Sequence, residues 1–340
     1  MKKKVTTPEQ LQRRKKVAVA TLITCIAAAM IGGSLHVMQL GSMRMDEMRA
    51  KASYNLGEMH EHIRAAGEEL HLQEKHEKNA ANVYTVAEAK ALLDAATQRE
   101  LSQMVEIPAG EFRMGTNLER ANEQNKPEHQ VHIGAFAIDK YPVTQAQYAL
   151  FVAENNYRPP LNWKEGHIPQ GMAKHPVTMV SWYNARAYCA WQGKRLPQES
   201  EWEKAARGTS GQRWPWGEHM QADSLNIYYK VGHTTAVDAY PHGASPFGVM
   251  DMAGNVQEWT ATEFAPYPGA NASSQVFHPK KLDASYSAGS EDVERVIYYV
   301  MRGGSWKSDP FSAATYHRNY SMPNYASDFY GFRCAKEIKQ

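Results

Sequence analysis

The residues best able to do chemistry lie near the C-terminus, in the stretch MRGGSWKSDPFSAATYHRNY. Tyr316, His317 and Arg318 are consecutive there, and an imidazole such as that of His317 can exchange a proton near neutral pH. Together with Trp306 and Ser308 they form a candidate cleft for binding or acid–base chemistry. A single histidine in an aromatic loop is also typical of a packed, hydrogen-bonded side chain. The sequence leaves both interpretations open.

Zinc and other histidine- or cysteine-ligated metals have little support in the residue pattern. The three cysteines form no Cys-x-x-Cys pair, which argues against a structural zinc site or a thioredoxin-like motif. Ligands on one helix face are expected at i and i+4, but four histidines of the N-terminal third are separated by 2, 9 and 5 residues: His60, His62, His71 and His76. Solvated histidines are the preferred interpretation.

The bulk composition limits the class of protein that must position these residues. The chain has 340 residues, enough for one large or two ordinary domains with a proper core. A net charge of +2 is too balanced to indicate a nucleic-acid partner. Charged residues make up 22% of the chain, close to the globular average. Function must therefore be sought in local motifs.

The N-terminus has the pattern of a membrane signal anchor. Residues 1–16 form a basic tail, and residues 17–40 carry no charged side chain. The most apolar part is short for a membrane helix of about 20 residues, but the whole run could span a bilayer. The basic flank predicts a cytoplasmic N-terminus, a single pass through the inner membrane and export of the remaining chain to the periplasm. A cleaved signal peptide is the alternative.

The rest of the chain divides by composition into a helical spacer, 41–103, and an irregular α+β domain, 104–338. The spacer is rich in helix-favouring residues, and one of its helices is expected over Val86–Leu101. Beyond it Gly, Pro, Trp and Tyr recur every few residues. Three helices are expected in the domain, over Thr144–Asn155, Ser181–Gln192 and Gln198–Arg207.

Six motifs of this domain occur in order: MVEIPAGEFRMG, DKYPVTQAQY, HPVTMVSWYNARAYCAWQGKRLPQESEWEKAARG, FGVMDMAGNVQEW, RGGSW and GFRC. Together they closely resemble the formylglycine-generating enzyme, or sulfatase-modifying factor, domain family. The resemblance covers residues 104–338. It implies a compact variant of the C-type lectin fold with little regular secondary structure.

The resemblance also speaks against the family's copper chemistry. Its enzymes oxidise a substrate cysteine to formylglycine with oxygen and a copper(I) ion held by two thiolates, which are soft ligands suited to that ion. The thiolates follow the Gly-Gly-Ser-aromatic motif, and the matching positions here are Ser308 and Ala313. Neither supplies a thiolate. The chain is therefore identified as a member of the copper-cysteine-lacking subgroup, and copper-dependent formylglycine generation is not expected.

Other retained residues have structural interpretations. The resemblance implies a disulfide between Cys189 and Cys334, which would persist in an exported protein. Gly303 and Gly304 allow backbone conformations or close approaches that other residues resist. Three tryptophans are expected to fill the core and one ion pair to hold loops: Trp182, Trp202 and Trp259, and Arg195 with Glu201.

Calcium is the cofactor that the resemblance implies. In the family a loop of the type found here as AGNVQEW binds the ion, which makes Asn255, Val256 and Glu258 candidates. Such oxygen donors suit a hard cation. A weaker second set is Asn226 and Ile227, because the acidic part that should follow them is shortened. A hydrogen-bonded turn of the same shape is the alternative at Asn255.

The predicted function is that of an accessory protein. Relatives without copper cysteines include periplasmic maturation proteins, such as the nitrite-reductase-associated and pyoverdine-maturation members. By similarity, this chain would assist the maturation or assembly of a periplasmic enzyme or complex, with a periplasmic or membrane protein partner in its cleft. One alternative is an enzyme with a different oxidative or acid–base activity in the same cleft, and another is a structural subunit of a membrane complex. Sulfoxide synthases are disfavoured because their His-x-x-x-His-x-Glu pattern is absent.

Overall fold

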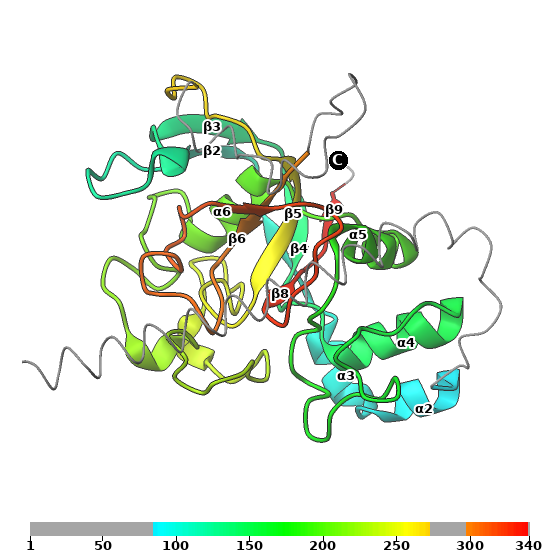
Figure 1. Cartoon of the computed structure of the whole chain (residues 1–340). Coiled ribbons are helices and arrows are strands. Elements are labelled where there is room, and N and C mark those ends of the chain that lie inside the picture. Colours follow the sequence, from blue (N-terminus) through cyan, green and yellow to red (C-terminus); the bar gives the residue numbers. More distant parts are fainter. Residues whose placement is uncertain (1–83, 273–296, 339–340) are drawn as a thin grey trace, which may run out of the picture. The chain divides into compact units, whose positions relative to one another are not determined.

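The computed structural model describes residues 84–272 and 297–338 of the chain (Figure 1). Three helices of the domain end within one residue of their predicted bounds: α4 (Gln145–Asn155), α5 (Trp182–Trp191) and α6 (Glu199–Arg207). Each begins with a capping box, in which the N-cap side chain and the third helical residue satisfy each other's backbone N–H groups. These caps explain why the sequence places the helix starts so closely.

The helix expected over Val86–Leu101 is wrong as a single element. It is divided into α2 (Val86–Ala91) and α3 (Ala95–Leu101), because Asp94 Oδ1 accepts hydrogen bonds from two backbone N–H groups of the second helix, each at 2.9 Å. Ala89 is buried in the same apolar cluster as α4 and α5. Residues 84–103, assigned from sequence to the spacer, thus pack as part of the domain.

Three small sheets complete the described fold. The first has the order β1 (Met104–Ile107), β4 (Phe136–Asp139) and β9 (Ala335–Glu337), and the second is the hairpin of β2 (Gly110–Met114) and β3 (His129–Ile133). The third has the order β7 (Asn319–Ser321), β6 (Tyr299–Arg302), β5 (Gln257–Glu263) and β8 (Tyr330–Gly331), with β5 and β8 parallel. Short 3₁₀ turns lie at Glu123–Asn125, Ala222–Ser224 and Pro241–Gly243. The architecture is α+β, with much of the backbone in loops.

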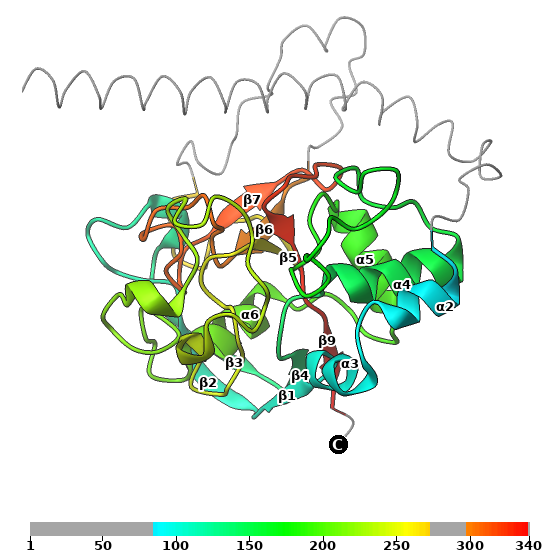
Figure 2. The same cartoon turned by 90° about the horizontal axis from the view of Figure 1, so that it is seen from below.

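The main apolar core lies among α2, α4, α5 and the β5–β6 pair. Figures 1 and 2 show these helices grouped together, away from the β2–β3 hairpin. The three predicted core tryptophans, Trp182, Trp202 and Trp259, are all buried. Cys189 of α5 forms a disulfide with Cys334, just before β9. The pairing that the resemblance implies is therefore present, and it joins the central helix to the C-terminal strand.

The predicted membrane anchor falls outside the described part of the chain. Between residues 84 and 272, and between 297 and 338, no helix is long and apolar enough to cross a bilayer. The basic tail (1–16), the anchor (17–40) and residues 41–83 of the spacer all lie outside these ranges and stay predictions.

Candidate functional site

A row of alternating buried charges supports the stretch that begins at RGGSW. Along α6, Glu199, Glu203 and Arg207 recur every four residues and share one helix face. Arg302, at the end of β6, ion-pairs with both glutamates. Arg318 holds Glu199 through two contacts of 2.7 and 3.0 Å. Arg207 Nη1 lies 2.7 Å from Glu203. The order Arg318–Glu199–Arg302–Glu203–Arg207 is called the charge row below.

Arg318 is a structural residue and does not face a cleft. Its Nη1 donates to the carbonyls of Gln124 and Ala265, both at 3.0 Å. The ring of Tyr267 lies 4.0 Å from the guanidinium carbon, and the side chain of Arg318 is almost fully buried. The sequence-based placement of Arg318 in the cleft is corrected because its hydrogen bonds are directed into the protein.

Arg302 folds the stretch back on itself. Its guanidinium donates to the carbonyls of Thr315, Tyr316 and His317 at 2.8, 3.0 and 2.7 Å. Between these ends, Gly304 has a φ of 68°, and a Cβ added there would lie 2.8 Å from the Cα of Ala313. The glycine is thus required by a close backbone approach, as predicted. The two ends of RGGSW…TYH are therefore joined by one buried arginine.

The positions that match the copper thiolates carry other contacts. Ser308 Oγ accepts a hydrogen bond of 2.9 Å from the backbone N–H of Ser305. Ala313 is fully buried in an apolar cluster with Trp214 and Leu225. One position closes a turn and the other fills a core, so neither offers a soft metal ligand.

Two consecutive tyrosines hold the loop of residues 305–311, which is called the clamped loop below, through main-chain hydrogen bonds. Tyr228 and Tyr229 have φ values of 59° and 57°, a left-handed conformation that is strained for bulky side chains. The backbone N–H of Tyr228 donates to Ser308 O at 2.9 Å, and that of Tyr229 donates to Trp306 O at 2.8 Å. The Tyr229 ring packs edge-on against Trp306. The strain is therefore held in place at the loop where the family has its reactive centre.

His317 is a poor candidate for an acid–base group. Burial and the neighbouring positive charge of Arg302 lower the pKa of His317 to about 4. Its Nδ1 lies 3.4 Å from the side-chain amide of Asn125, which can donate to it. Because efficient proton transfer needs a pKa near the working pH, the ring is suited to packing as a neutral group.

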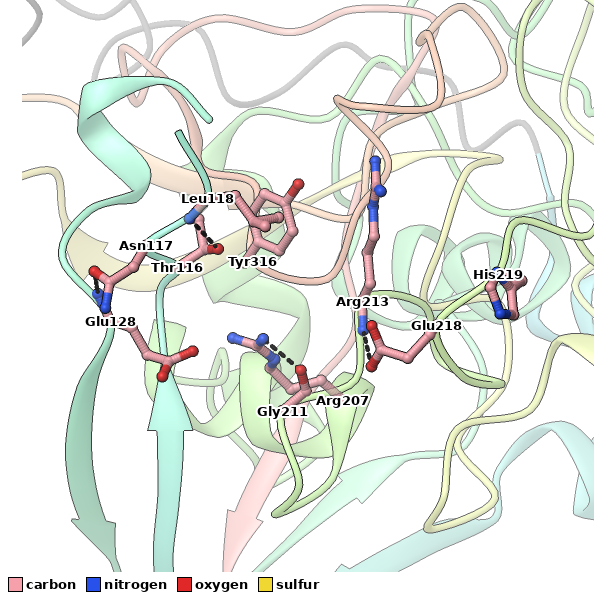
Figure 3. A pocket seen from close by; sticks show the side chains of 10 residues that line it. All are labelled: Thr116, Asn117, Leu118, Glu128, Arg207, Gly211, Arg213, Glu218, His219 and Tyr316. Carbon is pink, nitrogen blue, oxygen red and sulfur yellow. Dashed lines mark hydrogen bonds between the residues drawn. The ribbon is translucent and has the colours of Figure 1, made fainter. Parts of the chain in front are cut away.

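Tyr316 lies at a pocket that the other four candidates do not line. Figure 3 shows the pocket, which has a volume of about 600 Å³ and is lined by Thr116, Asn117, Leu118, Glu128, Arg207, Gly211, Arg213, Glu218, His219 and Tyr316. Trp306 and Ser308 belong to the clamped loop instead. The five residues predicted to share one cleft are thus divided among a loop, a buried network and this pocket.

The carboxylate of the stronger calcium candidate is engaged by the protein. Glu258 is fully buried, and its two oxygens accept hydrogen bonds from Arg333 Nε and Nη2, each at 2.6 Å. Asn255 instead donates through its side chain to Asp251 at 2.7 Å, and burial raises the pKa of Asp251 to about 7. Because Glu258 neutralises an arginine, the set of Asn255, Val256 and Glu258 does not fit a calcium ion.

In the weaker calcium set, Asn226 and Ile227, one side-chain oxygen has no hydrogen-bond partner among the described residues. Asn226 Nδ2 donates to the carbonyl of His233 at 2.9 Å, and Asn226 Oδ1 is buried without a hydrogen-bond partner among the described residues. A calcium ion takes about six to eight oxygen ligands. Nowhere in the described ranges do three or more His, Cys, Asp or Glu side chains form a group that could hold a metal. Asn226 and Ile227 alone therefore do not fit the ion either.

Comparison with known proteins gives the family. The sequence profile described as "Sulfatase-modifying factor enzyme 1-like domain" matches residues 89–338, which is more than half of the chain. The chain belongs to this family. Its membership confirms the resemblance drawn from the six motifs, and the match also includes α3 and the second half of α2, which pack on the domain.

This member of the sulfatase-modifying factor family is similar to proteins whose names indicate different roles. It is 34% identical over 255 residues to the serine/threonine-protein kinase Pkn1 of Chlamydia trachomatis serovar L2, covering 70% of this chain and 39% of the kinase. It is 31% identical over 291 residues to the inactive C-alpha-formylglycine-generating enzyme 2 of Bos taurus, and the match covers 68% of this chain and 87% of that protein. It is 28% identical over 306 residues to the hercynine oxygenase of Mycolicibacterium smegmatis, and the match covers 78% of this chain and 70% of the oxygenase.

A solved structure supports the same fold. PvdO from Pseudomonas aeruginosa superimposes with a TM-score of 0.54 and 27% identity, covering 71% of this chain and 96% of that one. The chain spans only 38–39% of the length of the chlamydial kinases that it matches. The family is thus shown, whereas the activity of a whole relative does not follow from it.

Most of the charge row is not apparent from the sequence, in which only Arg318 stands out. The predicted pairing of Arg195 with Glu201 is confirmed by two contacts of 2.7 Å. The i, i+4 spacing along ESEWEKAAR was an available signal for Glu199, Glu203 and Arg207. Their partner Arg302 is about a hundred residues away in sequence, and no local pattern predicts that pairing.

The lowered pKa of His317 predicts a pH dependence of stability. An unfolded histidine has a pKa of about 6.5, so between that value and about 4 the unfolded chain binds more protons than the folded one. The contribution of the neutral ring is therefore fully present above about pH 6.5 and is lost as the pH falls toward 4. Urea denaturation of full-length protein from pH 4 to 7 should give a steeper loss for the wild type than for His317→Asn. The control is His242→Asn, the same change at an exposed histidine. Equal slopes for the wild type and His317→Asn would contradict the prediction.

Proposed function

We propose that this protein is an exported, membrane-anchored member of the family that has no copper oxidase activity and assists the maturation or assembly of a periplasmic enzyme or complex. It does so by binding a protein partner at the loop where the family's enzymes have their thiolates. The observation that carries the proposal is the filling of both thiolate positions: Ser308 closes a turn and Ala313 is buried in a core.

The surface around this loop supports a binding role. Tyr228, Tyr229 and Phe311 are exposed by 69%, 48% and 51%, unusually high values for large aromatic side chains. The first two are attached to the loop by backbone hydrogen bonds, and Phe311 belongs to the loop itself. Rigid aromatic side chains of this kind are typical anchors in protein interfaces. Their strained backbone is consistent with a functional constraint at this position.

The anchor and the site of action are part of the same proposal. The basic tail and the uncharged run of residues 17–40 support a single-pass inner-membrane protein with its domain in the periplasm. The Cys189–Cys334 disulfide supports an oxidising compartment. The likeness to the inactive C-alpha-formylglycine-generating enzyme 2 supports the loss of copper chemistry.

Two other functions have weaker support. An acid–base or oxidative enzyme would need a titrating group in the cleft, and the low pKa of His317 disfavours that role. A purely structural subunit of a membrane complex would use the anchor and the segment before α2, and its partner would remain bound when the exposed aromatic residues are changed. The second experiment below separates this alternative from the proposal.

The absence of copper chemistry is tested directly. Purified full-length protein is incubated with copper(I), oxygen and a peptide containing a Cys-x-Pro-x-Arg sequence, and aldehyde is measured by mass spectrometry. We expect no aldehyde, because neither Ser308 nor Ala313 supplies a thiolate. A family enzyme with both cysteines serves as the positive control. Copper-dependent conversion of the peptide by this protein would refute the proposal.

The binding role is tested by Tyr228→Asn, a change that separates stability from function. Asparagine tolerates the left-handed conformation better than tyrosine, so the free energy of unfolding should stay the same or rise by about 0.5–1 kcal/mol. Loss of the exposed ring should reduce partner recovery after mild detergent extraction by about tenfold, as expected for an aromatic anchor.

Tyr183→Asn is the matched control for this experiment. Tyr183 is also 48% exposed, like Tyr229, but it lies on α5, and the change should leave partner recovery unaltered. Recovery of the partner at the wild-type level with Tyr228→Asn would favour the structural-subunit alternative. A wild-type protein that extracts as a monomer with no partner would refute both.

A further inference from the structure

The pocket in Figure 3 differs in character from the clamped loop, because charged side chains line it. Residues 116–118 follow β2, Glu128 precedes β3, and Arg207 to Arg213 lead out of α6. Its volume of about 600 Å³ is within the range of small-molecule sites, about 300–1,000 Å³. The side chains of Leu118 and Tyr316 provide an apolar part of the wall. A small molecule with both a charged and an apolar portion would match this lining.

The charge row brings an excess of positive charge to this pocket. In the row, three guanidinium groups share two carboxylates, so one positive charge has no carboxylate partner within it. At one end, Arg318 is covered by the ring of Tyr267 and by backbone carbonyls, which partly compensate its charge. The other end is Arg207, which lines the pocket. The row therefore places a positively charged group at the wall of the pocket.

Arg207 also has an unused hydrogen-bond donor. Its side chain is only 4% exposed, and two of its nitrogens donate to Gly115 O, Gly211 O and Glu203. Its Nε is buried with no hydrogen-bond partner among the described residues, and the same is true of Arg213 Nε. Buried donors without an acceptor are unfavourable, and an anion in the pocket would relieve this. In Figure 3 the Arg207 guanidinium lies between Glu128 on one side and Arg213 on the other.

A second guanidinium reinforces the positive potential beside Arg207. A Cβ added at Gly211 would lie 3.4 Å from nitrogens of both Arg113 and Arg207, so the two cations approach the same glycine. Arg113 is partly compensated by Glu128, at 3.7 Å. The two like charges repel each other, and an anion beside them would offset this repulsion.

We propose that this pocket binds a small monocarboxylate with an apolar body, whose negative charge is attracted by Arg207 and Arg213, two of the cations that line the pocket. A guanidinium binds a planar carboxylate through two parallel hydrogen bonds. The carboxylates of Glu128 and Glu218 at the same pocket would repel a doubly charged anion such as phosphate. The hydroxyl groups of Thr116 and Tyr316 can donate further hydrogen bonds. The pocket adjoins the loop, since the Arg213 guanidinium carbon lies 5.7 Å from the centre of the Phe311 ring. The proposed ligand is a small molecule, so its binding does not depend on the proposed protein partner.

The class of ligand is tested by calorimetric titration of the full-length protein with three probes. N-acetylphenylalanine carries the carboxylate and an apolar ring, its amide is the neutral analogue, and inorganic phosphate is the small anion. We expect the carboxylate to bind at least about tenfold more tightly than the amide, since a charged hydrogen bond is lost. Phosphate should bind more weakly than the carboxylate. Equal binding of acid and amide, tighter binding of phosphate, or no binding of the acid would overturn the proposal.

The location is tested by substitutions that spare the charge row. Arg207 is left intact because it also holds Glu203. Arg213→Gln should weaken binding of N-acetylphenylalanine by about tenfold, and Tyr316→Phe by a smaller factor, without change in the melting temperature. Arg186→Gln is the matched control, since Arg186 stacks on Trp182 just as Arg213 lies near aromatic rings, but it does not line the pocket. Unchanged affinity with Arg213→Gln, or an equal loss with Arg186→Gln, would refute the assignment.

Discussion

The described fold depends on the ion pairs that α6 makes with Arg302 and Arg318. Glu203 and Arg302 are both fully buried, and burying a charge is unfavourable by several kcal/mol unless a partner compensates it. The helix, the end of β6 and the loop beyond Ala313 can therefore only bury these residues together. The ion pairs of the charge row contribute little net stability. Their effect is to specify how these segments pack, because a different packing would leave a buried charge without its partner.

A second buried ion pair, Arg333 with Glu258, bears on the calcium site that the family resemblance implies. Arg333, in GFRC, takes both oxygens of Glu258 and also donates to the carbonyls at the start of the loop after β4. A carboxylate that already neutralises an arginine is a weaker ligand for calcium, because part of its charge and two of its acceptor sites are in use. The loop of Asn255 keeps its shape through hydrogen bonds to Asp251 and the backbone of Thr235. Charge pairing at Glu258 thus favours the hydrogen-bonded turn, one of the two interpretations that the sequence left open.

The parts of the structure that sequence could predict are those with a local cause. The helix starts at Thr144 and Ser181 follow from capping residues whose partners lie three positions on. The division of Val86–Leu101 also had a local cause, the Asp94 cap, but the apolar pattern across it concealed the break. The candidate site was predicted as a single cleft because its residues are neighbours in sequence. Arg302 donates instead to the main-chain carbonyls of Tyr316 and His317. Arg318 is held inside the protein by Glu199, whereas Tyr316 lines a pocket.

The hydrogen bonds from Tyr228 and Tyr229 bear on which side chains the clamped loop can carry. Both hydrogen bonds end on main-chain carbonyls, at Trp306 and Ser308, so they are indifferent to which side chain the loop carries. Exchange of a thiolate for a serine would leave this geometry untouched. The loop can therefore keep its main-chain architecture whichever side chains stand at the two thiolate positions.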